Sequence, residues 1–152
     1  MPGVFQKLNL KDQAEILVLN APASFEPELT ALSGVRVARA ARAVRAIEFA
    51  LAFGTRQAEV EAFARLVAQK AQGDAVIWFA YPKGTSRRYT CEFNRDTGWA
   101  ALGQAGFEPV RQVAIDEDWS ALRFRRAEFI KSLTRRQAIS QAGQARTAGR
   151  RK

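Results

Sequence analysis

The chain has 152 residues, enough for one domain, and its single cysteine and lack of histidine exclude an internal disulfide, a Ser-His or Cys-His catalytic pair and a histidine-ligated metal site. No apolar run is long enough to cross a bilayer, and the first residues lack the apolar segment of a secretory signal, so we expect a cytoplasmic protein with no membrane partner. The net charge of +9 lies in residues 120–152, which contain ten Lys or Arg and one acid, whereas residues 1–119 balance 14 basic against 14 acidic residues.

The first half of the chain alternates between strand and helix patterns. Residues 15–20 (EILVLN) are typical of a strand in a parallel sheet that is covered on both faces. Residues 25–32 predict a short helix with Ser24 as its N-cap, and further strands are predicted at 35–38 and 47–53. The segment between these two strands is shorter than a parallel crossover usually needs. Either it makes the crossover with few residues, or the second strand is a poorly paired edge of the sheet.

The second half continues the alternation and ends in a hairpin. Thr55 is the predicted N-cap of a helix that reaches Ala71 and has one apolar face. Residues 75–81 (AVIWFAY) predict the strongest strand, and residues 97–105 predict another helix. Strands at 110–115 and 121–126, joined by an acidic turn, should pair as an antiparallel hairpin. We therefore predict one Rossmann-like α/β domain over residues 1–128, with three layers and a mostly parallel sheet of about six strands, followed by a partly disordered basic extension over 129–152.

From Leu8 to Arg126 the sequence resembles a bacterial family of small Rossmann-like proteins of unknown function, through the stretches LKDQAEILVLNAPASF, IEFALAFGTRQAEVEAF, VIWFAYPKGTS and DEDWSALRF. This resemblance implies a fold and no activity. The terminal hairpin is also the arrangement of the S-adenosylmethionine-dependent methyltransferases, a more distant likeness. Their first loop is glycine-rich, and their second strand usually ends in an acid that holds the ribose. In this chain the loop position holds Asn20 to Ser24, and the position of the acid is approximately Arg39. We therefore expect no bound cofactor.

Polar residues collect where the predicted parallel strands end, which is where ligands bind in open α/β sheets. The segment from Tyr81 to Arg88 offers three cations, two hydroxyls and a flexible glycine, a set suited to a phosphate or carboxylate, although its spacing is not that of a P-loop. The alternative interpretation is a solvated basic loop, and for Asn20 and Ser24 a turn and a helix cap. The predicted anion site comprises Asn20, Ser24, Thr55, Tyr81, Lys83, Gly84, Thr85, Ser86, Arg87 and Arg88.

Two further features favour structural roles over chemical ones. Asp116, Glu117 and Asp118 lie at the hairpin turn, where acids are ordinary turn formers, so we predict no metal site. Cys91 lacks a histidine partner that would activate it, so we predict no catalytic residue.

The basic extension allows three interpretations: a solubility tail, a contact to an acidic protein, or a non-specific nucleic-acid anchor. The predicted nucleic-acid contacts are Arg135, Arg136, Arg146, Arg150, Arg151 and Lys152. Taken together, the sequence favours a non-catalytic binding or regulatory module for a small anionic metabolite. The alternatives are a divergent methyltransferase-like enzyme and a nucleic-acid-associated protein.

Overall fold

The computed structural model describes residues 3–93 and 98–130, and in this part of the chain six strands form one sheet. Their spatial order is β2-β1-β3-β4-β6-β5; β1 to β4 are parallel, and β6 pairs antiparallel with both β4 and β5. The strands are β1 (Glu15–Leu19), β2 (Arg36–Ala38), β3 (Ile47–Phe53), β4 (Ala71–Pro82), β5 (Phe107–Ala114) and β6 (Trp119–Arg126). The predicted fold class, a mostly parallel sheet with a C-terminal antiparallel hairpin, is confirmed.

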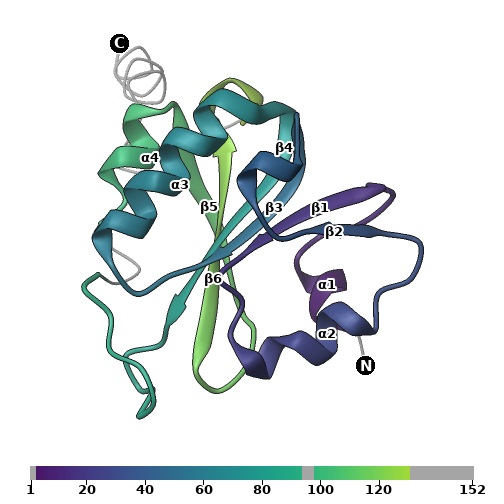
Figure 1. Ribbon diagram of the computed structural model, residues 1–152. Helices are drawn as coiled ribbons and strands as arrows, with labels where there is room; N and C mark the ends of the chain where they lie inside the picture. Colours follow the sequence, from purple (N-terminus) through teal and green to yellow (C-terminus); the bar gives the residue numbers. More distant parts are fainter. Residues whose placement is uncertain (1–2, 94–97, 131–152) are drawn as a thin grey trace.

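Helices cover both faces of this sheet, which gives three layers (Figure 1). One face is covered by α3 (Gln57–Lys70) and α4 (Ala100–Gln104), the other by α1 (Val4–Lys7) and α2 (Glu26–Thr30). Three single 3-10 turns complete the structure: η1 (Ala23–Phe25), η2 (Ala41–Ala43) and η3 (Ala127–Phe129). No helix among the described residues is both long enough and apolar enough to span a membrane.

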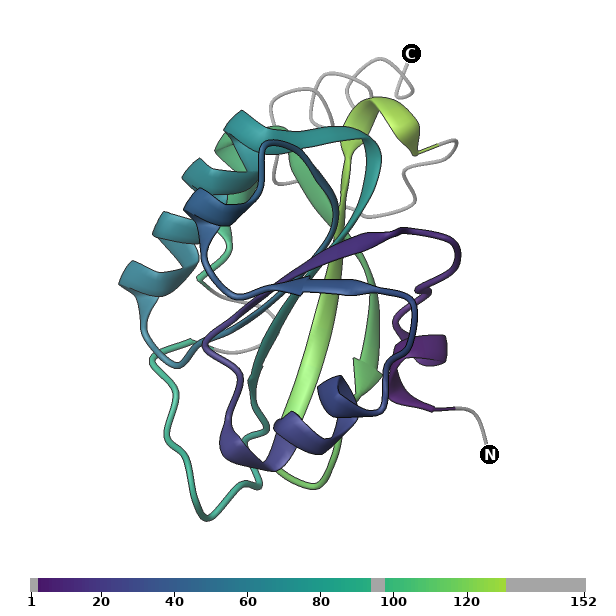
Figure 2. The same cartoon turned by 45° about the vertical axis from the view of Figure 1, so that its right-hand side comes forward.

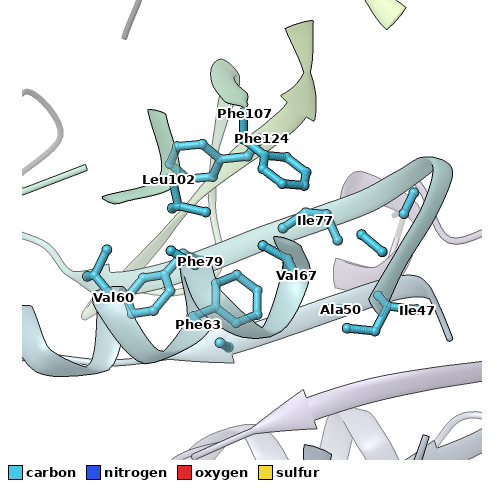
Figure 3. Close-up of a cluster of buried hydrophobic side chains, with 14 of the residues drawn as sticks. Ile47, Ala50, Val60, Phe63, Val67, Ile77, Phe79, Leu102, Phe107 and Phe124 are labelled. Carbon is cyan, nitrogen blue, oxygen red and sulfur yellow. The ribbon is translucent and has the colours of Figure 1, made fainter. Parts of the chain in front are cut away.

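Two hydrophobic cores lie on the two faces of the sheet. In the α3-side core, Val60, Phe63 and Val67 of α3 pack against β4 (Figure 3). Alternate residues of β4 point to opposite faces, so Ile77 and Phe79 join this core, whereas Val76, Trp78 and Ala80 join the α2-side core. Because both faces are covered, β4 is apolar at nearly every position from residue 75 onward.

The short passage from β2 to β3 is made without a helix. Strand β2 is the edge strand and β1 separates it from β3, so the chain must cross two strand spacings, about 10 Å. It must also run back about three residues along the strand direction, another ~10 Å. The eight residues between the two strands reach about 26 Å when extended, which is enough for both distances. The turn η2 lies in this segment, and Lys70 of α3 fixes it by donating to the carbonyl oxygens of Ala41 and Val44, both at 2.8 Å. The predicted second strand is therefore a paired edge.

The structure places several element ends differently from the sequence pattern. Ser24 lies inside η1 and caps no helix, since the turn and α2 begin without a side-chain cap. Helix α3 begins two residues after Thr55, with Arg56 as its N-cap. Strand β4 begins at Ala71 rather than at residue 75, because Ala71 pairs with Ile47 beyond a register shift. The polar residues 72–74 resemble a turn in sequence, and Gly73 has a left-handed φ of 55°, but the strand continues through them across the register shift.

Candidate functional site

The candidate site lies at the carboxyl ends of β1, β3 and β4. The segment after β1 leads to α2 on one face of the sheet, whereas the segment after β3 leads to α3 on the other face. Neighbouring strands whose connections leave in opposite directions open a crevice, and this is where ligands bind in open α/β sheets. Figure 2 shows the loop after β4 and the η1–α2 segment projecting from this same end of the sheet.

Three neighbouring cavities share walls along this rim. We call them the inner, middle and outer cavities, and the three together the strand-end crevice. The inner and middle cavities have Asn20, Phe53 and Glu59 in common, and the middle and outer cavities have Tyr89 in common. Their volumes are about 240, 370 and 680 Å³, respectively. The other inner walls are mostly apolar: Leu19, Ala41, Ala52, Ala62, Phe63, Leu66 and Phe79.

Asn20 occupies the position directly after β1, where the related folds have glycine. Its φ of 59° is left-handed, a conformation that glycine adopts freely and that asparagine tolerates better than most residues. Asn20 thus adopts here the left-handed conformation that glycine favours. What changes is that a side chain fills the turn: the Asn20 Nδ2 lies 3.5 Å from the Glu59 Oε2.

Glu59 links the rim to the start of α3. Its Oε1 accepts hydrogen bonds from the backbone N–H groups of Thr55 at 3.0 Å and Arg56 at 3.1 Å, so one carboxylate oxygen caps the helix. Within the described part of the chain, the other oxygen, Oε2, has only the long contact to Asn20. Glu59 therefore keeps a carboxylate oxygen that can accept a hydrogen bond from a ligand.

Trp119 lines the middle cavity and has a buried donor that lacks a partner in the described part of the chain. The residue is 4% exposed, and its indole Nε1 is buried without a hydrogen-bond partner among the residues described. Its ring lies between Phe53, with ring centroids 5.2 Å apart, and Tyr89, with centroids 4.9 Å apart. Because an unpartnered buried N–H costs about 1–3 kcal/mol, a ligand acceptor that reached it would gain a favourable contact.

The predicted basic loop is tied to the β5–β6 turn by Asp118. The Ser86 hydroxyl donates to the Asp118 Oδ1 at 2.9 Å, and the Lys83 N–H donates to the Asp118 carbonyl oxygen at 2.8 Å. The Arg88 Nε lies 3.9 Å from the Asp118 Oδ2. One hydroxyl and one cation of the predicted anion site therefore face a carboxylate.

The structure brings some of the predicted site residues together and separates others. Asn20 and Thr55 line the middle cavity, whereas Tyr81, Lys83, Gly84 and Ser86 line the outer one. Ser24, Thr85, Arg87 and Arg88 line none of the three cavities. The predicted nucleic-acid residues Arg135, Arg136, Arg146, Arg150, Arg151 and Lys152 lie outside the described residues.

Sequence reasoning missed three residues of the crevice: Glu59 and Tyr89, which each line two cavities, and Trp119, which lines the middle one. An acid in the first turn of a helix that follows a strand is a signal that could have pointed to Glu59. No comparable local signal marks Tyr89 or Trp119, because the two are 30 positions apart and meet only when the loop docks on the hairpin.

The acids of the hairpin turn and Cys91 are further candidates for a chemical role. The Asp116 Oδ1 accepts from the backbone N–H groups of Asp118 and Trp119, both at 2.8 Å, so it shapes the hairpin turn. In residues 3–93 and 98–130 no group of three or more Cys, Asp or Glu is arranged to hold a metal ion. Cys91 lines the outer cavity, and burial raises the pKa of its thiol.

Comparison with solved structures relates the fold to methyltransferases. A SAM-dependent methyltransferase from Aquifex aeolicus superposes with a TM-score of 0.56 at 13% identity, covering 81% of this chain and 87% of that one. The fibrillarin pre-rRNA processing protein of Methanococcus jannaschii superposes with a TM-score of 0.51 at 12% identity, covering 76% and 67%. No model of a known protein family and no curated protein sequence matches the chain. The chain thus has a Rossmann-like α/β fold distantly similar to that of SAM-dependent methyltransferases.

Proposed function

We propose that this protein is a binding module that holds a small molecule in the strand-end crevice. The observation that carries the proposal is the position of the inner and middle cavities: they lie side by side between β1 and β3, where the strand order reverses, and they share Asn20, Phe53 and Glu59. Concave sites with mostly apolar walls and a few converging polar groups are the usual form of small-molecule sites.

The walls suggest which groups the ligand carries. The inner cavity suits an aliphatic or aromatic group, because apart from Asn20 and Glu59 its walls are apolar. The free Glu59 oxygen calls for a hydroxyl or amino donor, and the Trp119 Nε1–H calls for an acceptor. Among the described residues, Glu59 is the charged residue that lines the inner and middle cavities, so this end favours a neutral or cationic group, whereas Lys83 and Glu92 both line the outer cavity. An anionic group, as the sequence predicts, would lie in the outer cavity beside Lys83.

Thermal unfolding in the presence of defined compounds tests this proposal. The panel consists of adenosine, adenosine monophosphate, S-adenosylmethionine, S-adenosylhomocysteine and inorganic phosphate. We expect at least one nucleoside-type compound to raise the Tm of the wild-type chain. The increase should be lost in Glu59→Gln, whose amide nitrogen is a donor where the carboxylate oxygen was an acceptor. Glu61→Gln, on the same helix but outside the crevice, is the matched control and should respond like wild type.

Two results would contradict the proposal. One is that no compound in the panel changes the Tm at millimolar concentration. The other is that Glu59→Gln and Glu61→Gln respond identically to a compound that binds wild type. Stabilisation by phosphate that Lys83→Ala abolishes would instead place an anion in the outer cavity, as the sequence predicts.

Methyl transfer is a second candidate, favoured by the likeness to the Aquifex structure. The residues here do not fit the usual cofactor arrangement, because the position after β2 holds Arg39 rather than an acid. Its guanidinium pairs with Glu26 at 2.7 Å. Calorimetry with S-adenosylmethionine tests this candidate: absence of binding at millimolar cofactor removes it and leaves the binding module.

A further inference from the structure

A cluster of arginines lies on the C-terminal hairpin, away from the strand-end crevice. In the β5–β6 pair, Arg111 is directly opposite Arg123, and in the β4–β6 pair Arg123 is opposite Trp78. Directly opposite residues share a face of the sheet, so two guanidinium groups lie side by side. Like charges in such a cross-strand pair destabilise the sheet unless something neutralises them.

Among the described residues, two acids lie on this face of the hairpin: Asp74, which pairs with Arg125, and the buried Glu108, which is directly opposite Arg125. Arg125, two residues along β6 on the same face, donates to both carboxylate oxygens of Asp74 and to the carbonyl oxygen of Phe129 at 3.0 Å. Within residues 3–93 and 98–130, neither Arg111 nor Arg123 forms a salt bridge. Arg111, Arg123 and Arg125 therefore lie together on one face with one of the three salt-bridged in this part of the chain, and we call them the arginine patch.

Arg123 is also incompletely hydrogen-bonded. Its Nε is buried and has no partner in the described part of the chain. Burial lowers the pKa of Arg123, and the positive charge of Arg125 lowers it further. A guanidinium donates best to planar or tetrahedral oxyanions, and an oxyanion at this place would offset the repulsion between Arg111 and Arg123.

The sequence that follows continues the positive charge. The described chain ends at Ile130, one residue after Phe129, whose carbonyl oxygen Arg125 binds. Residues 131–152 contain seven Lys or Arg and no acid. The patch alone could hold a single phosphate. Together, the three arginines of the patch and the seven basic residues that follow make ten cations, which match a partner with a row of phosphates.

We propose that the arginine patch is part of a nucleic-acid-binding surface, where Arg111 and Arg123 contact backbone phosphates. Such contacts carry no sequence preference by themselves, and they displace counterions, so affinity falls with added salt. This surface is independent of the strand-end crevice.

Fluorescence anisotropy with a labelled single-stranded RNA tests the proposal on the full chain. The double variant Arg111→Gln/Arg123→Gln is compared with Arg42→Gln/Arg65→Gln, which removes the same charge from two exposed arginines elsewhere. For the patch variant we expect the slope of log affinity against log salt to fall in magnitude by roughly 0.7 for each lost phosphate contact. The control variant should keep the wild-type slope.

Equal loss of slope in both double variants would show that net charge alone matters, and it would overturn the patch as a site. Competition by polyglutamate as effective as that by unlabelled RNA would overturn the assignment of nucleic acid as the partner. Since removing Arg123 changes a half-buried position, the single variant Arg111→Gln, at an exposed position, serves as a second test and should show half of the slope change.

Discussion

Trp78 and Trp119 lie in the same hydrophobic core but differ by one hydrogen bond. The Trp78 Nε1 donates to the carbonyl oxygen of Leu8 at 2.7 Å, whereas the Trp119 Nε1 is buried without a partner among the residues described. Replacing either residue by phenylalanine removes a similar volume. In Trp78→Phe the Leu8 oxygen also loses its side-chain donor, so we expect this variant to unfold more easily than Trp119→Phe by about 1–3 kcal/mol.

Urea unfolding of the two variants without ligand measures this difference. The two substitutions serve as each other's control for the lost ring volume. Equal free energies of unfolding would show that the Trp78 hydrogen bond contributes nothing net.

Cys91 is a second residue whose surroundings decide its chemistry. Burial is the main cause of its raised pKa, and the nearby Glu92 acts in the same direction. Because the thiolate is the nucleophile, we expect alkylation by iodoacetamide at pH 8 to be slower than that of a cysteine in a short peptide. The rate should still be rising at a pH where the peptide thiol has levelled off. A rate equal to that of the peptide at pH 8 would contradict the raised pKa.

At the scale of elements, the start of α3 depends on Glu59. Its carboxylate accepts from two backbone N–H groups that the helix itself leaves without partners. Substituting Glu59 by alanine should therefore lower the free energy of unfolding by roughly 0.5–2 kcal/mol, the usual range for a lost cap.

Glu61→Ala, on the same helix beyond its first turn, is the matched control and should change stability little. Thermal or urea unfolding of both variants decides the question. If the Glu61 variant were as destabilised as the Glu59 variant, the effect would come from helix charge and not from the cap.

At the scale of the whole molecule, the two cores are expected to unfold together. They lie on opposite faces of the sheet, but β3 and β4 contribute residues to both. Phe63→Ala in the α3-side core and Phe25→Ala in the α2-side core should each cost about 3–5 kcal/mol. In both variants, far-UV circular dichroism and tryptophan fluorescence should report the same urea midpoint. Separate midpoints would show that the two faces are independent folding units.

The fold was largely predictable because strand and helix patterns are local. The apolar run of 75–81 and the spacing of Val60, Phe63 and Val67 indicate how each element is buried, and the structure places them accordingly. Element ends were less predictable, as Thr55 shows, because a cap depends on where the backbone turns. Of the predicted anion site, Tyr81, Lys83, Gly84 and Ser86 do line one cavity, but the role predicted for them stays a prediction.

The sequence by itself determined that strands and helices alternate, that the last two strands form a hairpin, and that the excess charge lies at the end of the chain. Only the tertiary structure decided which polar groups meet. Docking of the loop on the hairpin turn directs Ser86 and Arg88 to Asp118, and the register of β5 with β6 sets Arg111 opposite Arg123. These contacts join residues 12 to 32 positions apart, and the electrostatics of a site depend on distance in space, which local patterns do not encode.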